Sequence, residues 1–312
     1  MARVAVLGGG LIGCGWAAAF AGAGHEVVVV DPDPATADRL ADTWTKAQPA
    51  MLALETLAEQ TQAPRHESSA DALASVELVQ EALPENLALK HRALGEIEGI
   101  IPAHVPIASS SSGFTPQMIA QGMEFPERLF IAHPCNPPYL MPTVELIGQE
   151  ITPASALDAA QALYEGMGKT VLRMAKPMQG HLVNRLQFAL WREAVNLVAS
   201  GAATLPDVER AVTEGLAPRW CLMGPAGVFH LSGGARGMEG YLDALGPATS
   251  AMWDDLGAPD LAKAADALIA GMAQSDPRPV AEIGQARDEA LPRVLRALKP
   301  IKSNYHQKGG TT

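Results

Sequence analysis

The stretch Val4-Ala-Val-Leu-Gly-Gly-Gly-Leu-Ile-Gly13 joins a short apolar run to a set of spaced glycines. The apolar run is typical of a buried strand, and a helix is expected to follow it through Trp16–Phe20. A second apolar run, Glu26–Asp31, ends in an acid. Strand, glycine turn, helix, strand and terminal acid, in this order, are the pattern of a dinucleotide-binding βαβ unit.

Each position in the glycine turn has an expected role. Gly8 permits a tight turn, Gly10 lets the backbone approach a pyrophosphate, and Gly13 lets the helix lie close on the sheet. The helix N-terminus at Leu11 and Ile12 presents free N–H groups and the positive end of the helix dipole to the phosphates. The alternative is a glycine-rich turn in some other α/β protein.

The acid at the end of the second strand predicts which dinucleotide is bound. Asp31 lies eighteen residues beyond Gly13, where a carboxylate can hydrogen-bond a ribose 2′-hydroxyl. Pro32 and Asp33 follow it, so no adjacent arginine is present to receive a 2′-phosphate. We therefore expect NAD rather than NADP.

Length and composition limit the class of protein. A chain of 312 residues suggests about two domains at ~150 residues each. The net charge of −11, without a basic block, makes nucleic acid and anionic membranes poor partners. The three cysteines form no close pair, which suits a reducing cytoplasm, and no histidine has metal-ligand spacing. No run reaches the ~18–20 apolar residues of a membrane span.

A change of pattern near residue 176 divides the chain. Before it, strands alternate with helices, whereas after it helical patterns dominate. We predict an α/β Rossmann-type domain that binds NAD over residues 1–176, and an all-helical substrate or dimerisation domain over 177–312. Two helices, 34–46 and 50–60, are expected on either side of Pro49. The helix expected over 181–200 has apolar residues on two sides, which favours a homodimer.

The segment 131–145 carries the candidate base. Strands are expected at 129–132 and 144–147, and the four prolines between His133 and Glu145 forbid a helix there. Such a loop can fold back so that the carboxylate meets the imidazole. The carboxylate then fixes the tautomer and leaves the other ring nitrogen to take a proton. The alternative is a histidine with a purely structural role.

Several motifs together resemble the L-3-hydroxyacyl-CoA dehydrogenase superfamily. They are Gly8–Gly13, Glu81-Ala-Leu-Pro-Glu-Asn86 with Lys90, the serine run Ser109–Gly113, His133 with Glu145, and Leu182-Val-Asn-Arg185. The segments His133-Pro-Cys-Asn-Pro-Pro-Tyr139 and Glu214–Trp220 are most similar to the branch of lambda-crystallin and L-gulonate 3-dehydrogenase. Leu190-Trp-Arg-Glu-Ala194 and Ser112-Gly113 are more similar to L-carnitine 3-dehydrogenase.

The resemblance implies an activity and a set of site residues. The chain would be an NAD-dependent dehydrogenase that oxidises the 3-hydroxyl of a small free L-3-hydroxy acid, as L-gulonate 3-dehydrogenase does. Carnitine or an acyl-CoA ester is an alternative substrate, and a non-enzymatic crystallin role is an alternative of another class. The implied catalytic residues are His133, Glu145, Ser111 and Asn184. Residues implied to border the cofactor or the substrate are Glu81, Asn86, Lys90, Ser109 and Asn136.

Other interpretations of these residues remain open. Ser110 or Ser112 could replace Ser111, helix packing could explain Asn184, and Glu81 could form a surface ion pair with Lys90. An acyl-CoA substrate is disfavoured because residues 35–80 hold three basic and seven acidic residues, a net charge of −4 that repels a polyanion.

A free acid needs a cation to bind its carboxylate. Arg219 is the candidate because its planar guanidinium can bind a carboxylate with two parallel hydrogen bonds. The alternative is that Arg219 pairs with an acid such as Glu214 or with a second subunit.

Overall fold

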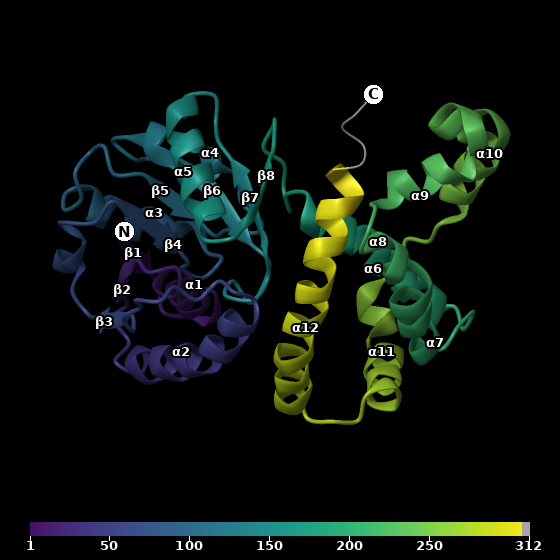
Figure 1. Ribbon diagram of the computed structural model, residues 1–312, viewed down its shortest axis with the longest axis horizontal. Coiled ribbons are helices and arrows are strands. Elements are labelled where there is room, and N and C mark those ends of the chain that lie inside the picture. Colours follow the sequence, from purple (N-terminus) through teal and green to yellow (C-terminus); the bar gives the residue numbers. More distant parts are fainter. Residues whose placement is uncertain (308–312) are drawn as a thin grey trace. The chain divides into compact units, whose positions relative to one another are not determined.

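The computed structural model describes the backbone of residues 1–307 and the side chains of residues 1–302. An eight-stranded sheet occupies the first part of the chain, with strand order β3-β2-β1-β4-β5-β6-β7-β8 (Figure 1). All neighbouring strands are parallel except β6 and β7. The strands are β1 (Arg3–Leu7), β2 (Glu26–Val30), β3 (Arg65–Glu67), β4 (Leu78–Glu81), β5 (Ile107–Ser109), β6 (Leu129–Pro134), β7 (Thr143–Ile147) and β8 (Thr170–Arg173). The order of the first six strands is that of a Rossmann sheet, which confirms the predicted fold class.

Side chains alternate between the two faces of the sheet and build a separate core on each. Val4 and Val6 pack on one face with Trp16 of α1 (Leu11–Gly22) and Tyr164 of α5 (Ala154–Gly166). Ala5 and Leu7 point the other way. There they share a core with residues of α3 (Leu87–Glu98) and α4 (Pro116–Ile119). The helices thus cover both faces, as a parallel sheet requires.

The prediction that Pro49 separates two helices is wrong. A single helix, α2 (Thr36–Ala53), runs through the proline, and the expected helix over 50–60 is absent. Pro49 is exposed, so the carbonyl of Thr45 that it leaves without an N–H partner can be hydrated. Ala47, Ala50 and Met51 are buried, and their packing carries the helix past the proline.

The sheet-containing part of the chain also has two short 3-10 helices, and a long helix follows its last strand. The 3-10 helices are η1 (Ala70–Leu73) and η2 (Pro126–Arg128), and the long helix that follows β8 is α6 (Val183–Ala199).

The contacts within the chain divide it into two compact units. The first contains Met1–Asn184 and Asp288–Arg293, and the second contains Arg185–Arg287 and the chain from Val294. The division by contacts therefore falls eight residues after residue 176, within α6. The assignment of residues 1–176 to cofactor binding and of 177–312 to substrate binding or dimerisation stays a prediction.

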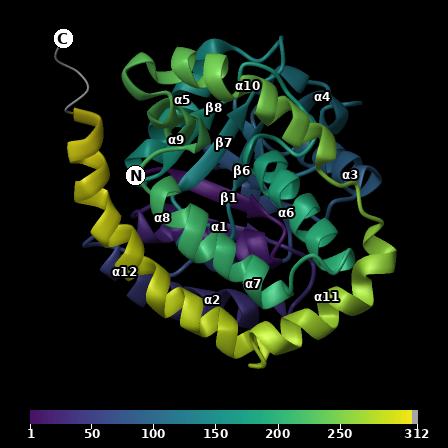
Figure 2. The same ribbon diagram turned by 90° about the vertical axis from the view of Figure 1, so that its right-hand side faces the viewer.

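The described part of the chain beyond β8 contains helices and loops only (Figure 2). Its elements are α7 (Leu205–Arg210), η3 (Ala211–Leu216), α8 (Ala217–Trp220), α9 (Pro225–Ser232), η4 (Gly234–Arg236), α10 (Gly237–Asp255), α11 (Leu261–Ser275) and α12 (Val280–Gln307). Leu205 packs closely against Gly271 of α11, and the ring of Phe229 packs at a tilt of 31° on that of Tyr241 of α10, with 4.9 Å between the ring centroids.

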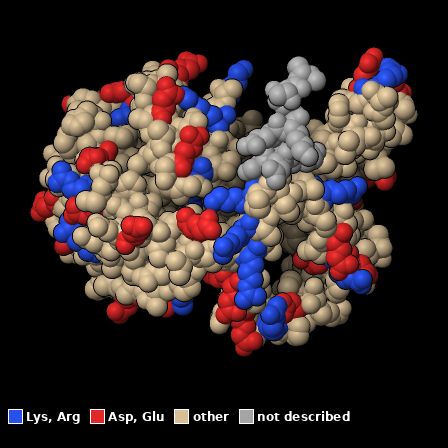
Figure 3. Space-filling view, in the orientation of Figure 1, with Lys and Arg blue, Asp and Glu red and all other residues tan. Residues whose placement is uncertain are grey.

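Acidic and basic side chains are interspersed over the face of the first unit shown in Figure 3. This agrees with the mixed charge of the sequence. Among the described residues, no helix combines the length and the apolar character that a membrane crossing requires.

Candidate active site

The glycine turn after β1 has the geometry that the sequence predicts. Gly8 has a φ of +103°, a conformation in which a side chain would be strained. A Cβ on Gly13 would lie 1.9 Å from the carbonyl oxygen of Gly8, so only glycine lets α1 start this close to the turn. A Cβ on Gly10 would meet nothing within 4 Å. The backbone at Gly10 is therefore open to an approaching group.

The N-terminus of α1 fits a phosphate-bearing cofactor. Gly10 is the N-cap residue and supplies no side-chain hydrogen bond to the first N–H groups of the helix. Leu11 is 72% exposed. Uncapped N–H groups at an open helix N-terminus favour an anion. These residues fit the pyrophosphate of NAD.

Asp31 lies beside the same turn. Its carboxylate accepts hydrogen bonds from the N–H of Gly9 at 2.6 Å and from the N–H of Asp33 at 2.8 Å. The tertiary structure also brings Arg39 here, which the local sequence did not indicate. Its guanidinium donates to the carbonyl of Gly9 at 3.2 Å and to the carboxylate of Asp33 at 2.8 Å. An arginine thus lies near the expected ribose site, but Asp33 neutralises it.

His133 and Glu145 meet as expected. They are partners in the register of β6 and β7, and His133 Nδ1 lies 2.7 Å from Glu145 Oε2. A carboxylate can only accept, so Nδ1 carries the proton and Nε2 keeps its lone pair. His133 is 7% exposed and Glu145 1%. Their catalytic roles stay predictions.

The carboxylate of Glu145 is held by further hydrogen bonds. Its second oxygen accepts from the N–H groups of Leu182 at 2.6 Å and Val183 at 2.9 Å, at the start of α6. Burial alone would raise the pKa of Glu145. The hydrogen bonds from His133, Val183 and Leu182 outweigh burial and leave the pKa below its ordinary value. The ionised form can therefore stabilise a protonated His133.

A buried lysine anchors the loop between the two strands. Lys169 Nζ donates to the carbonyl oxygens of Pro138 and Met141, the latter at 2.9 Å. Burial lowers the pKa of Lys169 to about 8. On the other side of the loop, a Cβ on Gly15 of α1 would lie 2.6 Å from Pro138 Cδ. The loop is thus held between α1 and the turn before β8.

The structure distinguishes the serines of the run 109–113. Ser110 is half-buried, and its Oγ accepts hydrogen bonds from two core side chains, from Trp16 Nε1 at 3.1 Å and from Gln80 Nε2 at 2.8 Å. Ser112 is exposed. Ser111 is 2% exposed, and its hydroxyl donates to Glu85 Oε1 at 2.6 Å. A contact between Ser111 and a substrate stays a prediction.

Glu81 and Lys90 form the ion pair that was considered as an alternative, but the pair is buried and not at the surface. Lys90 Nζ lies 2.6 Å from Glu81 Oε1, and the two side chains are 1% and 0% exposed. Ser109 donates its hydroxyl proton to the other oxygen of Glu81. Asn86 caps α3 by accepting from the N–H of Leu89. The structure thus shows Glu81, Lys90 and Ser109 paired with one another. Their contact with a cofactor stays a prediction.

The remaining predicted residues belong to three different segments of the chain. Asn136 is exposed in the loop that follows β6, and Asn184 is half-buried at the start of α6. Arg219 belongs to the second unit, where its guanidinium donates to the carbonyl of Gly215 at 3.1 Å. Glu214 pairs instead with Arg210, at 3.6 Å. A π-helical turn over 211–216 leads directly from α7 into α8.

Two residues near the base were not singled out by the sequence. Glu85 lies within the motif 81–86, and its carboxylate holds Ser111 and also the N–H of Gly113 at 2.7 Å. His181 lies just before the motif 182–185, and its ring centroid is 5.1 Å from that of His133. In the sequence, the signal for Glu85 was its position within the motif 81–86, and the signal for His181 was its position next to the motif 182–185.

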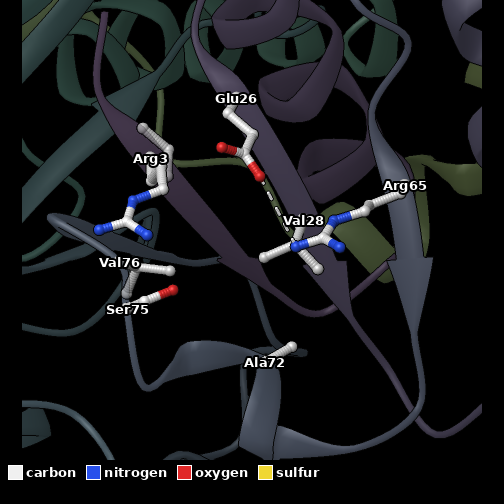
Figure 4. A pocket seen from close by; sticks show the side chains of 8 residues that line it. Arg3, Glu26, Val28, Arg65, Ala72, Ser75 and Val76 are labelled. Atoms are coloured by element: carbon white, nitrogen blue, oxygen red, sulfur yellow. Dashed lines mark ion pairs between the residues drawn. The ribbon is translucent and has the colours of Figure 1, made fainter.

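A shallow pocket lies at the opposite ends of the strands, far from the glycine turn. Arg3, Glu26 and Arg65, the first residues of β1, β2 and β3, line it (Figure 4). Arg65 pairs with Glu26 at 3.8 Å. Ligands of open α/β sheets bind at the carboxyl ends of the strands. This pocket is therefore not the candidate active site.

The glycine turn and His133 lie at the carboxyl ends of β1 and β6 in one sheet, and Glu145 faces His133 from the antiparallel strand β7. This arrangement fits an NAD-dependent dehydrogenase. The chain belongs to the 3-hydroxyacyl-CoA dehydrogenase family. The family's NAD-binding domain matches residues 3–177, and its C-terminal domain matches residues 180–264. The family relationship supports an oxidoreductase that uses NAD.

Similar proteins cover nearly the whole chain. L-carnitine dehydrogenase of Streptomyces coelicolor is 42% identical over 95% of this chain and 94% of its own length. L-carnitine dehydrogenase of Pseudomonas aeruginosa is 36% identical over 96% of this chain and 95% of its own. A crystal structure of an NAD-dependent dismutase, 5-formyl-3-hydroxy-2-methylpyridine 4-carboxylic acid 5-dehydrogenase, superposes with a TM-score of 0.85. It is 27% identical and covers 96% of this chain and 99% of its own.

Proposed function

We propose that this protein is an L-carnitine 3-dehydrogenase, which oxidises the 3-hydroxyl of L-carnitine to a ketone with NAD. The observation that carries the proposal is the 42% identity to an L-carnitine dehydrogenase over nearly the full length of both chains. The sequence favoured L-gulonate as substrate and carnitine as an alternative. The similar proteins named above are L-carnitine dehydrogenases, so they favour carnitine.

The histidine–glutamate pair supports the proton transfer that this reaction needs. Nε2 of His133, which keeps its lone pair, accepts the proton of the substrate hydroxyl. Glu145 stabilises the positive charge that then develops on the imidazole. NAD, when bound, accepts the hydride from the carbon that bears the hydroxyl. Burial of both side chains keeps competing water away from the pair.

Hydrogen bonds to the reacting oxygen are assigned to Ser111 and Asn184. The Ser111 hydroxyl donates its single proton to Glu85 in this structure, so donation to the substrate oxygen requires that hydrogen bond to be exchanged. Among the described residues, none forms a hydrogen bond with the Asn184 side chain, so its amide can donate to a substrate. Arg219 remains our candidate for binding the carboxylate of the substrate.

The decisive experiment compares substrates in one assay. NADH formation would be measured with L-carnitine, D-carnitine, L-gulonate, L-3-hydroxybutyrate and L-3-hydroxybutyryl-CoA, with the variant His133→Gln as the inactive control. We expect the highest kcat/KM with L-carnitine and little turnover of its enantiomer. A higher kcat/KM for L-gulonate or for the CoA ester would replace carnitine as the proposed substrate.

We further propose that the protein is a cytoplasmic homodimer. Leu186, Phe188 and Trp191 of α6 are 59%, 60% and 39% exposed, which supports an apolar contact with a second copy. Light scattering coupled to size-exclusion chromatography tests the dimer. A monomer at micromolar concentration would contradict it.

A further inference from the structure

His181 combines two features that cost folding free energy. Its backbone has a φ of +51°, in the left-handed region that residues other than glycine seldom adopt. Its side chain is 0% exposed, and within the described chain its Nδ1 has no hydrogen-bond partner. A buried polar atom without a partner costs about 1–3 kcal/mol. Such local costs concentrate at functional sites.

The other ring nitrogen of His181 makes a defined contact. Nε2 lies 2.8 Å from the carbonyl oxygen of Ser111. Because a carbonyl can only accept, Nε2 carries the proton and Nδ1 is an acceptor. Burial lowers the pKa of His181, and the Ser111 hydrogen bond offsets this only in part. Burial thus disfavours a positive charge on this ring, whose centroid is 5.1 Å from that of His133.

The chain on either side of His181 connects this contact to the catalytic pair. The residue turns in the left-handed conformation, and the next two N–H groups, of Leu182 and Val183, both point at Glu145 Oε1. The other oxygen of Glu145 holds His133. One short segment thus contacts the serine loop through a side chain and the carboxylate through its backbone.

We propose that His181 is a positioning residue, which joins the loop at Ser111 to the carboxylate of Glu145 through one side-chain and two main-chain hydrogen bonds. It keeps the serine and the base in one geometry without touching the substrate. An apolar residue of similar size would fill the space without leaving a nitrogen unpaired, but it would lose the link to Ser111.

The test uses two side chains of equal length. His181→Gln keeps an N–H donor near the position of Nε2, whereas His181→Met has none. Glutamine and methionine are both unbranched at Cβ, and each must adopt the same left-handed backbone conformation at position 181. The matched control is the same pair of substitutions at His91, whose Nε2 lies 2.8 Å from the carbonyl of Met118 on an exposed surface. If His181→Met does not fold, His181→Phe provides the variant without a donor.

The first measurement is turnover of L-carnitine, which rests on the proposed function. A misplacement of about 1 Å can cost on the order of 10²-fold in rate, so we expect a loss of kcat of about that size in His181→Met. His181→Gln should recover most of it, the Kd for NAD should be unchanged, and the His91 variants should match the wild type.

The second measurement needs no substrate. Carbon NMR of labelled glutamate carboxyls, assigned with Glu145→Gln, follows the titration of Glu145. We expect its lowered pKa to rise in His181→Met and to stay low in His181→Gln. Unchanged kcat and titration in His181→Met, or equal losses in both variants, would overturn the proposal. The expected titrations without any wild-type turnover of L-carnitine would support the positioning role and reject carnitine.

Discussion

His133 and Glu145 are twelve residues apart in the chain, yet they are direct partners across the antiparallel pair β6 and β7. The sheet register sets their 2.7 Å contact, so the contact does not depend on the conformation of the loop between them. A shift of one residue in the register would turn one of the two side chains to the opposite face of the sheet. The candidate base is therefore held by main-chain hydrogen bonds.

We expect His133→Gln to lower kcat with L-carnitine by ~10²–10⁴-fold, because general-base catalysis contributes about this much. Glu145→Gln should have a smaller effect, since the imidazole remains. Steady-state kinetics measure the two losses of kcat, and NAD titration measures cofactor binding. His104→Gln, at an exposed position, is the control. Turnover near the wild-type level in His133→Gln would remove the base assignment.

Gly10 and Gly13 form a matched pair that separates cofactor binding from folding. A Cβ on Gly10 meets nothing, so Gly10→Ala should leave the Tm unchanged while it weakens NAD binding by filling the space of the pyrophosphate. A Cβ on Gly13 would clash with the carbonyl of Gly8, so Gly13→Ala should lower the Tm even without NAD. Calorimetry of the protein with and without NAD distinguishes the two effects. Equal Kd for NAD in Gly10→Ala and the wild type would contradict the expected phosphate site.

Asp31 and Asp33 together should control the choice between NAD and NADP. Asp31→Ala should weaken NAD binding by about 1.5–3 kcal/mol through the loss of a charged hydrogen bond. Adding Asp33→Ser releases Arg39 from its 2.8 Å ion pair, so that its guanidinium can receive a 2′-phosphate. We expect the double variant to gain NADP activity that Asp31→Ala lacks. Equal kcat/KM of the wild type for both cofactors would argue against the role of Asp31.

Lys169 should give the stability a dependence on alkaline pH. Its pKa is lowered from 10.5 to about 8 in the folded protein, so the unfolded chain binds more protons between these values. The free energy of unfolding should therefore rise with pH from about 8 to about 10.5. Urea unfolding across this range should show the rise in the wild type and in Lys263→Met, whose lysine is 85% exposed, but not in Lys169→Met. Parallel curves for all three proteins would show that burial of Lys169 does not shift its pKa.

The role of Arg219 in binding the substrate carboxylate is tested by comparison with Arg210, which lies in the same run of helices. Arg219→Met should raise KM for L-carnitine and leave NAD binding unchanged, and Arg219→Lys should recover only part of the loss because an ammonium lacks the planar fork. Arg210→Met is the control, since Arg210 pairs with Glu214. Wild-type KM in both Arg219 variants would assign the carboxylate contact to another residue.

Features written in consecutive residues could be predicted from the sequence. The turn from Gly8 to Gly13, the strand ending at Asp31 and the contact of His133 with Glu145 depend on local backbone geometry and on one hairpin-like pairing. The misjudged proline shows the limit of local rules. Pro49 breaks a helix when considered alone, but burial of Ala47 and Met51 on the opposite side outweighs its lost hydrogen bond.

The sequence by itself determined the Rossmann fold, the preference for NAD and the candidate base, because each follows from spacing and residue type within a short stretch. Only the tertiary structure decided which serine faces Glu85, that Arg39 is neutralised near Asp31, and that His181 lies against His133. The contacts of Ser111 with Glu85, of His181 with His133 and of Arg39 with Gly9 join residues far apart in the chain. Their formation depends on how the sheet and its loops pack, and no local propensity encodes that packing.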